Sequence, residues 1–187
     1  MTAKVAVIVG SLRRDSVNRQ FAEALGRLVR PKLEFDLVEI ADLPLYNQDL
    51  EVDLPAPAQR LKRRIEGADA VLFVTPEFNR SFSSALKNAV EWGSRPWGKN
   101  SWAGKPGAIV GMTLGAVGTA AAQSQLRSVA TAIDVHLMAQ PEIYLSFKDG
   151  QIVEGEVADA ELRKLLEGWA DRFADWIARL KQPALAR

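Results

Sequence analysis

The sequence predicts an α/β fold in which a parallel sheet is covered by helices on both faces. Three observations support this prediction. Short apolar runs rich in β-branched residues alternate along the chain with helical patterns, as in strands joined by crossover helices. One of these runs, Ala70–Val74, is apolar at every position, which is typical of a strand buried on both faces. Finally, 187 residues with 48% apolar and 25% charged content suit one compact domain, residues 1–187.

The expected strands are residues 4–9, 33–40, 70–74 and 108–113, with a fifth beginning at 135–138. The expected helices start at about residue 18 and then cover 58–66, 83–92, 119–133 and 159–180. In the last helix apolar residues recur every three or four positions, so this stripe is expected to pack on the core. Right-handed crossovers join such strands. Five parallel strands match the flavodoxin-like order 2-1-3-4-5, a three-layer architecture with helices on both faces.

The loop after the first strand has the composition of a phosphate site. Gly10 ends the strand, Ser11, Ser16 and Asn18 supply neutral donors, and Arg13 supplies a cation. A helix then begins, and a helix N-terminus presents unpaired N–H groups and the positive end of a dipole. Ordinary N-capping is the alternative explanation, although one polar residue would be enough for a cap. The G-x-x-x-x-G-K-[ST] and G-x-G-x-x-G nucleotide loops are absent after this strand.

Two further loops should lie at the same edge of the sheet. Residues 75–82 follow the third strand and contain Pro76 and Phe78, whereas residues 113–119 follow the fourth strand and contain Gly115 and Gly118. A turn that needs proline or glycine explains each loop alone about equally well. Together with the first loop, they suit a mononucleotide with a planar ring, and flavin mononucleotide (FMN) fits that shape.

Composition excludes several other classes of site. With no cysteine, the chain has no disulfide and no thiolate metal ligand. The single histidine, His136, lies in an apolar strand pattern and is interpreted as structural, so no metal site is expected. A net charge of +1 gives no support for a nucleic-acid partner. No apolar run reaches the roughly 20 residues of a membrane span and no signal peptide is evident, so we expect a cytoplasmic protein.

At this point the motifs carry a family resemblance. Ser11-Leu12-Arg13-x-x-Ser16-x-Asn18, Thr75-Pro76-Glu77-Phe78-Asn79 and Leu86-Lys87-Asn88-Ala89 follow one another in order. This pattern resembles the NADPH-dependent FMN reductase family, in particular its chromate and quinone reductase branch, and the similarity extends over nearly the whole chain. The resemblance implies bound FMN and two-electron reduction of quinones or metal oxyanions, with NADPH or NADH as the electron donor.

The resemblance also implies which residues hold the cofactor. Those around the phosphate would be Ser11, Arg13, Ser16, Val17 and Asn18. Those along the ribityl chain and ring would be Pro76, Glu77, Phe78 and Asn79, with Thr113 and Gly115 closing over the far end. Because the flavin is the redox centre, no side chain is assigned as catalytic, and Glu77 is expected to present its backbone to the ring. Donor and acceptor would then share one ring face, in a ping-pong cycle.

Two positions depart from the family pattern. Arg80 stands where close relatives often carry tyrosine, and Ser124-Gln125 stands where they can carry an aromatic residue. Arg80 and Arg95 are candidate residues of the substrate or NAD(P)H mouth, where they would favour anionic acceptors or the phosphates of NADPH. Ordinary surface arginines are an equally good explanation.

Three tryptophans, Trp92, Trp97 and Trp102, are close together in a segment with little helix-forming sequence. An interface would explain them, a lid over the flavin is the competing explanation, and core packing of one or two remains open. The resemblance adds an expected homodimer or homotetramer. The main alternative function is a flavodoxin-type electron carrier that does not itself oxidise a nicotinamide. Such carriers are strongly acidic, and this chain is near neutral.

Overall fold

The computed structural model describes residues 2–181. Its main sheet is parallel and runs β2 (Leu33–Leu37), β1 (Ala3–Val9), β3 (Ala70–Val74), β4 (Pro106–Thr113) and β5 (His136–Leu137). Paired residues such as Val9 and Val74 place the carboxyl ends of β1 and β3 beside each other. The predicted flavodoxin-like order is therefore confirmed, and its switch point lies between β1 and β3.

The outermost position beyond β4 is filled by two short strands instead of one continuous strand. β5 pairs with the start of β4, and β6 (Ile143–Ser146) pairs with its end. Pro141 lies between them and has no amide hydrogen to contribute to the ladder. β6 helps to form the carboxyl edge of the sheet, because it runs beside the end of β4 as far as Thr113.

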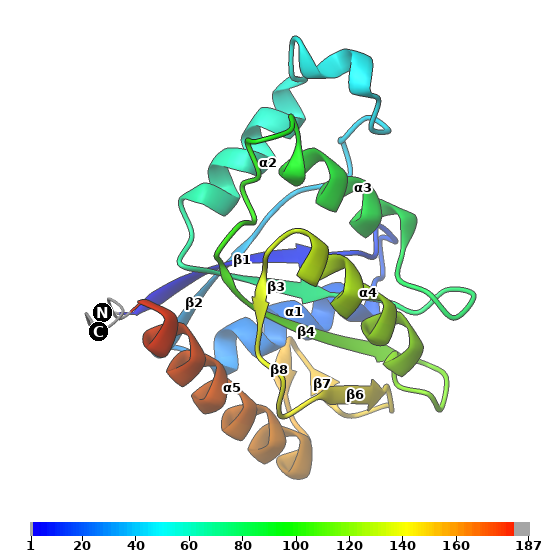
Figure 1. The fold of residues 1–187 in the computed structure, drawn as a ribbon. Coiled ribbons are helices and arrows are strands. Elements are labelled where there is room, and N and C mark those ends of the chain that lie inside the picture. Colours follow the sequence, from blue (N-terminus) through cyan, green and yellow to red (C-terminus); the bar gives the residue numbers. More distant parts are fainter. Residues whose placement is uncertain (1, 182–187) are drawn as a thin grey trace.

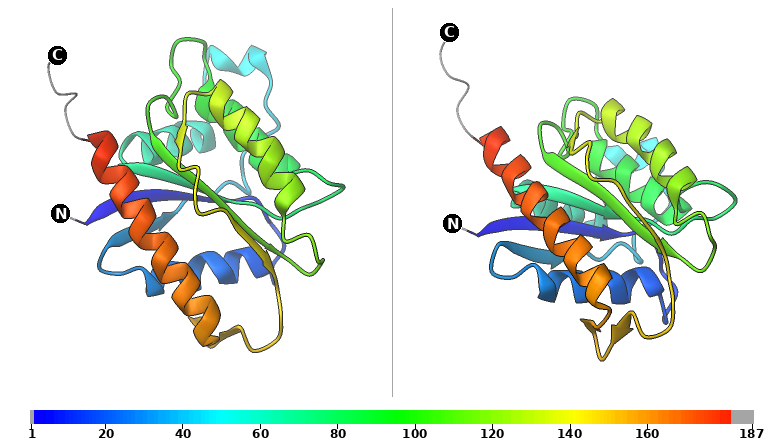
Figure 2. Two further views of the ribbon diagram at one scale, coloured as in Figure 1. Left: turned by 60° about the horizontal axis from the view of Figure 1, so that its bottom comes forward. Right: turned by 90° about the horizontal axis from the view of Figure 1, so that it is seen from below.

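Helices cover the two faces unequally (Figures 1 and 2). On one face lie α1 (Val17–Leu28) and α5 (Ala160–Lys181); on the other lie α2 (Ala56–Glu66), α3 (Ser84–Ser94) and α4 (Ala120–Ala132). Successive strand residues point to opposite faces. Accordingly, Val5 and Val7 pack in the cluster with α1 and α5, whereas Ala6 and Ile8 pack with the other three helices.

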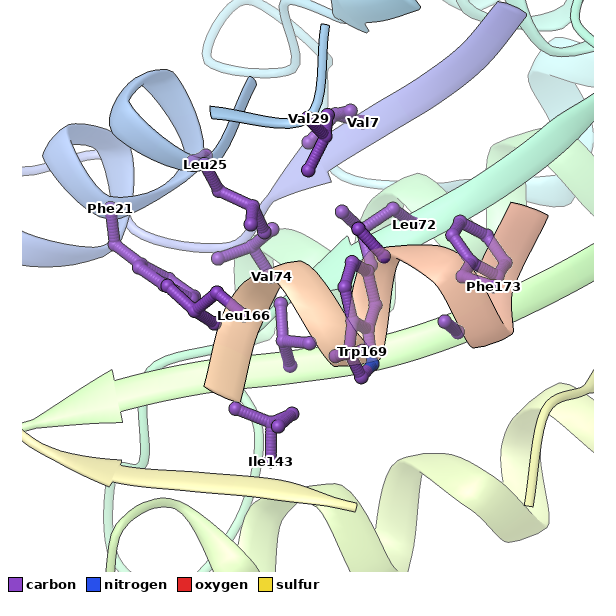
Figure 3. Packing of buried hydrophobic residues seen from close by; sticks show 14 of the residues in the cluster. Val7, Phe21, Leu25, Val29, Leu72, Val74, Ile143, Leu166, Trp169 and Phe173 are labelled. Atoms are coloured by element: carbon purple, nitrogen blue, oxygen red, sulfur yellow. The ribbon is translucent and has the colours of Figure 1, made fainter. Parts of the chain in front are cut away.

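Most of the apolar stripe of α5 is confirmed as core packing, whereas Leu165 and Leu180 are 46% and 39% exposed. Leu166, Trp169 and Phe173 point from α5 toward the sheet residues Leu72 and Val74 (Figure 3). All five side chains are at most 1% exposed. The rings of Trp169 and Phe173 lie with their centroids 5.3 Å apart. Because α5 packs in one cluster with α1 and β4, it holds these two elements in place. It thereby positions the sheet edge at which the loop before α1 and the loop after β4 meet.

Some local structure differs from the sequence prediction. β2 ends at Leu37 rather than at residue 40, because Val38 and Ile40 turn into the cluster on the α2 and α3 face. A short 3₁₀ helix, η1 (Gln48–Glu51), precedes α2. A two-stranded antiparallel hairpin, β7 (Ile152–Val153) and β8 (Glu156–Val157), precedes α5. Strands of two residues are too short for hydrophobic periodicity to reveal.

The tryptophan segment is mainly part of the core. Trp92 and Trp102 are fully buried, and their indole N–H groups donate to the carbonyls of Pro44 (2.8 Å) and Val90 (3.0 Å). Only Trp97 of the three is on the surface, at 88% exposure. Core packing, which the sequence left open for one or two of the tryptophans, is therefore confirmed for Trp92 and Trp102, and only Trp97 remains a candidate for an interface or a lid. Within residues 2–181, no helix is both long and apolar enough to cross a membrane.

Candidate active site

The loop from β1 to α1 presents unpaired amides at the carboxyl edge of the sheet (Figure 1). Ser16 caps α1, since its Oγ accepts a hydrogen bond from the Arg19 amide at 3.1 Å. The amides of Val17 and Asn18, in the first turn, have no acceptor among residues 2–181. These donors, together with the positive end of the helix dipole, form a site suited to an anion such as a phosphate.

Gly10, where the loop begins, is held by hydrogen bonds to β3 and to the residue that caps α3. Its amide donates to the Val74 carbonyl at 2.8 Å, and the Ser83 hydroxyl donates to the Gly10 carbonyl at 2.6 Å. A Cβ at position 10 would lie 2.7 Å from Ser83 Oγ, closer than side-chain carbons come. Ser83 was not a candidate in the sequence. Its only signal was a hydroxyl at the start of a predicted helix, where it also caps α3.

The Asn18 side chain is used within the protein. Its Nδ2 donates to the Met112 carbonyl at 2.8 Å, and the Met112 amide donates to its Oδ1 at 2.9 Å. Asn18 is 4% exposed, and this pair of bonds ties α1 to β4. The sequence suggested that this side chain would donate to the phosphate. These bonds use the Oδ1 acceptor and one of the two Nδ2 hydrogens, so the second Nδ2 hydrogen and the backbone amide are the donors that remain for a phosphate.

The loop after β3 ends in a tight two-residue turn. The amides of Phe78 and Ser81 each donate to the carbonyl of the other at 2.9 Å. Between them, Asn79 and Arg80 have φ angles of 51° and 66°, as a type I′ turn requires. Before the turn, Thr75 is fully buried and its hydroxyl donates to the Pro76 carbonyl at 2.7 Å. The turn leaves the Phe78 ring 56% exposed at the sheet edge.

The carboxylate of Glu77 caps α4. Its Oε2 accepts from the amides of Ala121 at 3.1 Å and Ala122 at 3.2 Å. The residue at the N-cap position, Thr119, makes no capping bond with its own side chain. The Glu77 side chain is only 10% exposed. A carboxylate held by a helix N-terminus is a structural anchor, which agrees with the expectation that Glu77 offers its backbone to a ligand.

Gln125 is a second contact from α4 to the same turn. Its Nε2 donates to the Arg80 carbonyl at 2.8 Å, and the Ser81 hydroxyl donates to its Oε1 at 2.7 Å. In the sequence Gln125 was noticed only in relation to the family pattern, and no contact was predicted for it. Its role depends on a contact 44 or 45 residues away along the chain, which no local pattern reveals.

The loop after β4 is held on the side of β6. The Gly115 amide donates to Thr113 Oγ1 at 3.3 Å, and the Ser146 hydroxyl donates to the Gly115 carbonyl at 2.9 Å. A Cβ on Gly111 would lie 2.2 Å from the Thr75 carbonyl oxygen, so glycine lets β4 approach the end of β3 closely. Thr113 and Gly115 thus lie at the same edge as the other two loops, as the sequence predicts.

Apolar side chains are exposed on all three loops. The exposed fractions are 52% for Leu12, 56% for Phe78, 73% for Leu114 and 41% for Val117. These residues follow β1, β3 and β4, which are neighbours in the sheet. An apolar rim beside unpaired amides suits a ligand with a flat ring and an anionic tail.

The two arginines expected at the mouth lie in different places. Arg80 is in the turn, with its Nη1 3.7 Å from Glu77 Oε1 and its side chain 72% exposed. Arg95 immediately follows the 11-residue helix α3, which begins near the loops and is roughly 16 Å long. Arg95 therefore lies far from the loops of its own chain, where it is 5.8 Å from the centroid of the Trp97 ring. Within one chain, Arg95 thus lies at the opposite end of α3 from the loops, and its place at a mouth stays a prediction.

The site is organised for binding more than for acid–base catalysis. Its one buried carboxylate, Glu77, is held by backbone amides. Among residues 2–181 there is no group of three or more His, Asp or Glu side chains that could hold a metal ion. A bound cofactor with its own reactivity would suit a site of this kind.

Comparison with known proteins identifies that cofactor chemistry. The model of a family described as NADPH-dependent FMN reductase matches residues 3–150. A 2-hydroxy-1,4-benzoquinone reductase from a Burkholderia species is 49% identical over 178 residues, covering 95% of this chain and 97% of that protein. A quinone reductase from Pseudomonas putida is 43% identical over 174 residues, covering 92% and 94%. The structure of FerB, a flavoenzyme NAD(P)H:(acceptor) oxidoreductase from Paracoccus denitrificans, matches with a TM-score of 0.92 at 44% identity, covering 95% and 98%.

Proposed function

The chain belongs to the NADPH-dependent FMN reductase family, and on this premise we propose that it is an FMN-dependent NAD(P)H:quinone oxidoreductase. The observation that carries the proposal is the meeting of unpaired α1 amides with exposed apolar side chains at one sheet edge. The relatives named for quinone reduction cover nearly the full chain. Their level of identity favours a reductase over an electron carrier.

The described residues fit FMN. The phosphate would be bound by the α1 amides of Val17 and Asn18, with Ser11, Arg13 and Ser16 around it. The ribityl chain and ring would lie along Pro76, Glu77, Phe78 and Asn79, with Thr113 and Gly115 at the far end. In this arrangement Glu77 acts through its backbone, because its side chain is bonded to α4. Asn18 would offer its backbone amide and the second Nδ2 hydrogen, since the first is bonded to β4.

When bound, FMN supplies two-electron redox chemistry. The protein's part is to hold the ring at the edge of the sheet with one face open beside Phe78. Nicotinamide and quinone would occupy this one surface in turn, and each is flat enough to stack there. No side chain needs to transfer a proton, which agrees with the engaged carboxylate of Glu77.

Metal oxyanions such as chromate are proposed as slower, less specific acceptors. The support is the position of Arg80, an exposed cation in the turn that carries Phe78. Its field would raise the local concentration of anions, and salt would weaken the effect.

A homodimer, or a homotetramer built from dimers, is proposed for the assembly. Trp97 is 88% exposed and lies beside Arg95 at the far end of α3. Aromatic residues and arginine are enriched at interfaces. In such an assembly, Arg95 of one copy would lie at the flavin mouth of the other copy, since Arg95 does not reach the mouth of its own chain. A cytoplasmic location and a single domain over residues 1–187 also stay predictions.

The proposed function is tested by initial rates with both substrates varied. The FMN-loaded protein is assayed with NADPH, and separately with NADH, against a neutral benzoquinone. Parallel double-reciprocal lines are expected, because donor and acceptor share one surface. Intersecting lines would contradict the shared surface, and no oxidation of either nicotinamide would contradict the reductase.

A further inference from the structure

A cavity of about 250 Å³ opens on the β2 side of the phosphate loop. It is bordered by the loop itself, by α1 and by the backbone that leaves β2, residues 37–41. None of the residues from the loops after β3 and β4 lines it. The cavity therefore shares Ser11 and Arg13 with the proposed phosphate site, but it borders the end of β2 rather than the loops after β3 and β4.

The cavity is lined by three arginines, Arg13, Arg14 and Arg19. Across residues 2–181, Arg13 and Arg14 form no ion pair, and Arg19 pairs with Glu23 at 3.2 Å on the helix surface. Glu39 is the one carboxylate on the lining of the cavity as described. Its Oε1 accepts from the amides of Ile40 at 3.1 Å and Ala41 at 2.9 Å. The cavity thus has an excess of positive charge.

The cavity lies where nucleotide-binding sheets distinguish ribose from ribose phosphate. In dinucleotide folds a residue about 20 positions after the first loop accepts from the ribose 2′-hydroxyl if acidic, whereas a nearby arginine accommodates a 2′-phosphate. Here Glu39 and the arginines line the same space beyond the ends of β1 and β2. The α1 amides would already be used by the FMN phosphate, so a second phosphate needs other donors.

The size of the cavity limits what it can take. Pockets for whole drug-sized ligands are about 300 Å³ or larger. A cavity of about 250 Å³ is suited to one phosphorylated ribose, with the rest of a dinucleotide lying outside it. Guanidinium groups are the side chains best shaped to bind phosphate oxygens in pairs.

We propose that this cavity binds the 2′-phosphate on the adenosine ribose of NADPH, with Arg14 and Arg19 as its ligands and Glu39 beside the ribose. The proposal rests on the proposed function for its choice of nucleotide. It makes NADPH the preferred donor over NADH, which has a hydroxyl at the same position.

The test is calorimetric binding of adenosine 2′,5′-bisphosphate to the FMN-loaded protein. Adenosine 5′-monophosphate and inorganic phosphate are the comparison ligands, and R14A, R19A and the double variant are compared with R63A, which removes an exposed arginine of α2. We expect the bisphosphate to bind more tightly than either comparison ligand. Each cavity variant should weaken it about tenfold or more, the effect of about 1.4 kcal/mol, whereas R63A should not. The KM for NADPH should rise in parallel while the KM for NADH stays constant.

Several results would overturn the proposal. Equal bisphosphate affinity in R14A, R19A and the unaltered protein would remove these arginines from the site. Loss of FMN in the same variants would assign them to the FMN phosphate. Equally tight binding of inorganic phosphate would mean a free-phosphate site rather than a nucleotide site. Calorimetric binding is measured without turnover, so this test can be read even if the protein proves to have no quinone reductase activity.

Discussion

The role of Glu77 gives the sharpest test of how the site is built. Its carboxylate accepts two α4 amides and its side chain is 10% exposed, so E77A should leave the first turn of α4 uncapped. Losing a helix cap costs about 0.5–2 kcal/mol, and losing a charge at a helix N-terminus costs about 0.3–1 kcal/mol. E77A should therefore lower the free energy of unfolding by about 1–3 kcal/mol, which for a chain of this size lowers Tm by roughly 2–12 °C.

E77Q separates anchoring from catalysis. The glutamine keeps an acceptor for the α4 amides and loses only the charge, so it should cost about 1 kcal/mol or less. Thermal unfolding of the FMN-loaded variants measures stability, and turnover with NADPH and a quinone measures function. E77Q should keep turnover within a few-fold of the unaltered protein. The matched control is E167Q, which removes an exposed carboxylate on α5.

One result would refute this interpretation. A loss of turnover of about a hundredfold or more in E77Q, with FMN content and Tm unchanged, would mean that Glu77 transfers a proton or binds substrate. In that case the carboxylate would have to leave α4 during the reaction.

Three further predictions concern the other loops. R13A should weaken FMN by about 1.5–3 kcal/mol but leave riboflavin affinity unchanged, because only FMN has the phosphate; equal losses in a fluorescence titration would place Arg13 elsewhere. N18L should lower the free energy of unfolding by about 2–4 kcal/mol in urea denaturation, since it leaves the Met112 amide and carbonyl buried without partners; an unchanged midpoint would contradict the tie between α1 and β4. R80A should lower chromate turnover at low salt more than turnover of a neutral quinone, and the difference should vanish at high salt; equal effects on both acceptors would remove Arg80 from anion attraction.

Hydrophobic patterning was enough to predict the layers of this fold. Runs such as Ala70–Val74 become strands because every residue is covered on one face or the other. It did not predict β6, which takes up the outer position again after the polar break of Gln140, Pro141 and Glu142. For Trp92 and Trp102 it favoured an interface and left core packing open. Their segment lacks helical propensity, yet indole hydrogen bonds to the Pro44 and Val90 carbonyls let both rings pack in the core.

The candidate site was predictable at the level of loops but not of atoms. Capping of α1 was the alternative explanation that the sequence offered for this loop, because helix caps have a local signature, and Ser16 does cap α1. The bonds of the Asn18 side chain to Met112 were not predicted, because Met112 is 94 residues away. The contacts of Gln125 with Arg80 and Ser81 were not predicted for the same reason, since these partners are 45 and 44 residues away. The 11 residues of α3 separate Arg95 from the loops of its own chain, and whether a second copy brings it to a mouth is not a question that local patterns answer.

The central claim is that FMN at the three-loop edge is the sole carrier of electrons between donor and acceptor. Anaerobic mixing of the FMN-loaded protein with one equivalent of NADPH, followed by one equivalent of a benzoquinone, tests it most directly. The claim predicts that the flavin absorbance bleaches fully before any quinone is added and then recovers fully when it is. Bleaching that requires quinone to be present, or a purified protein that cannot retain FMN, would contradict it.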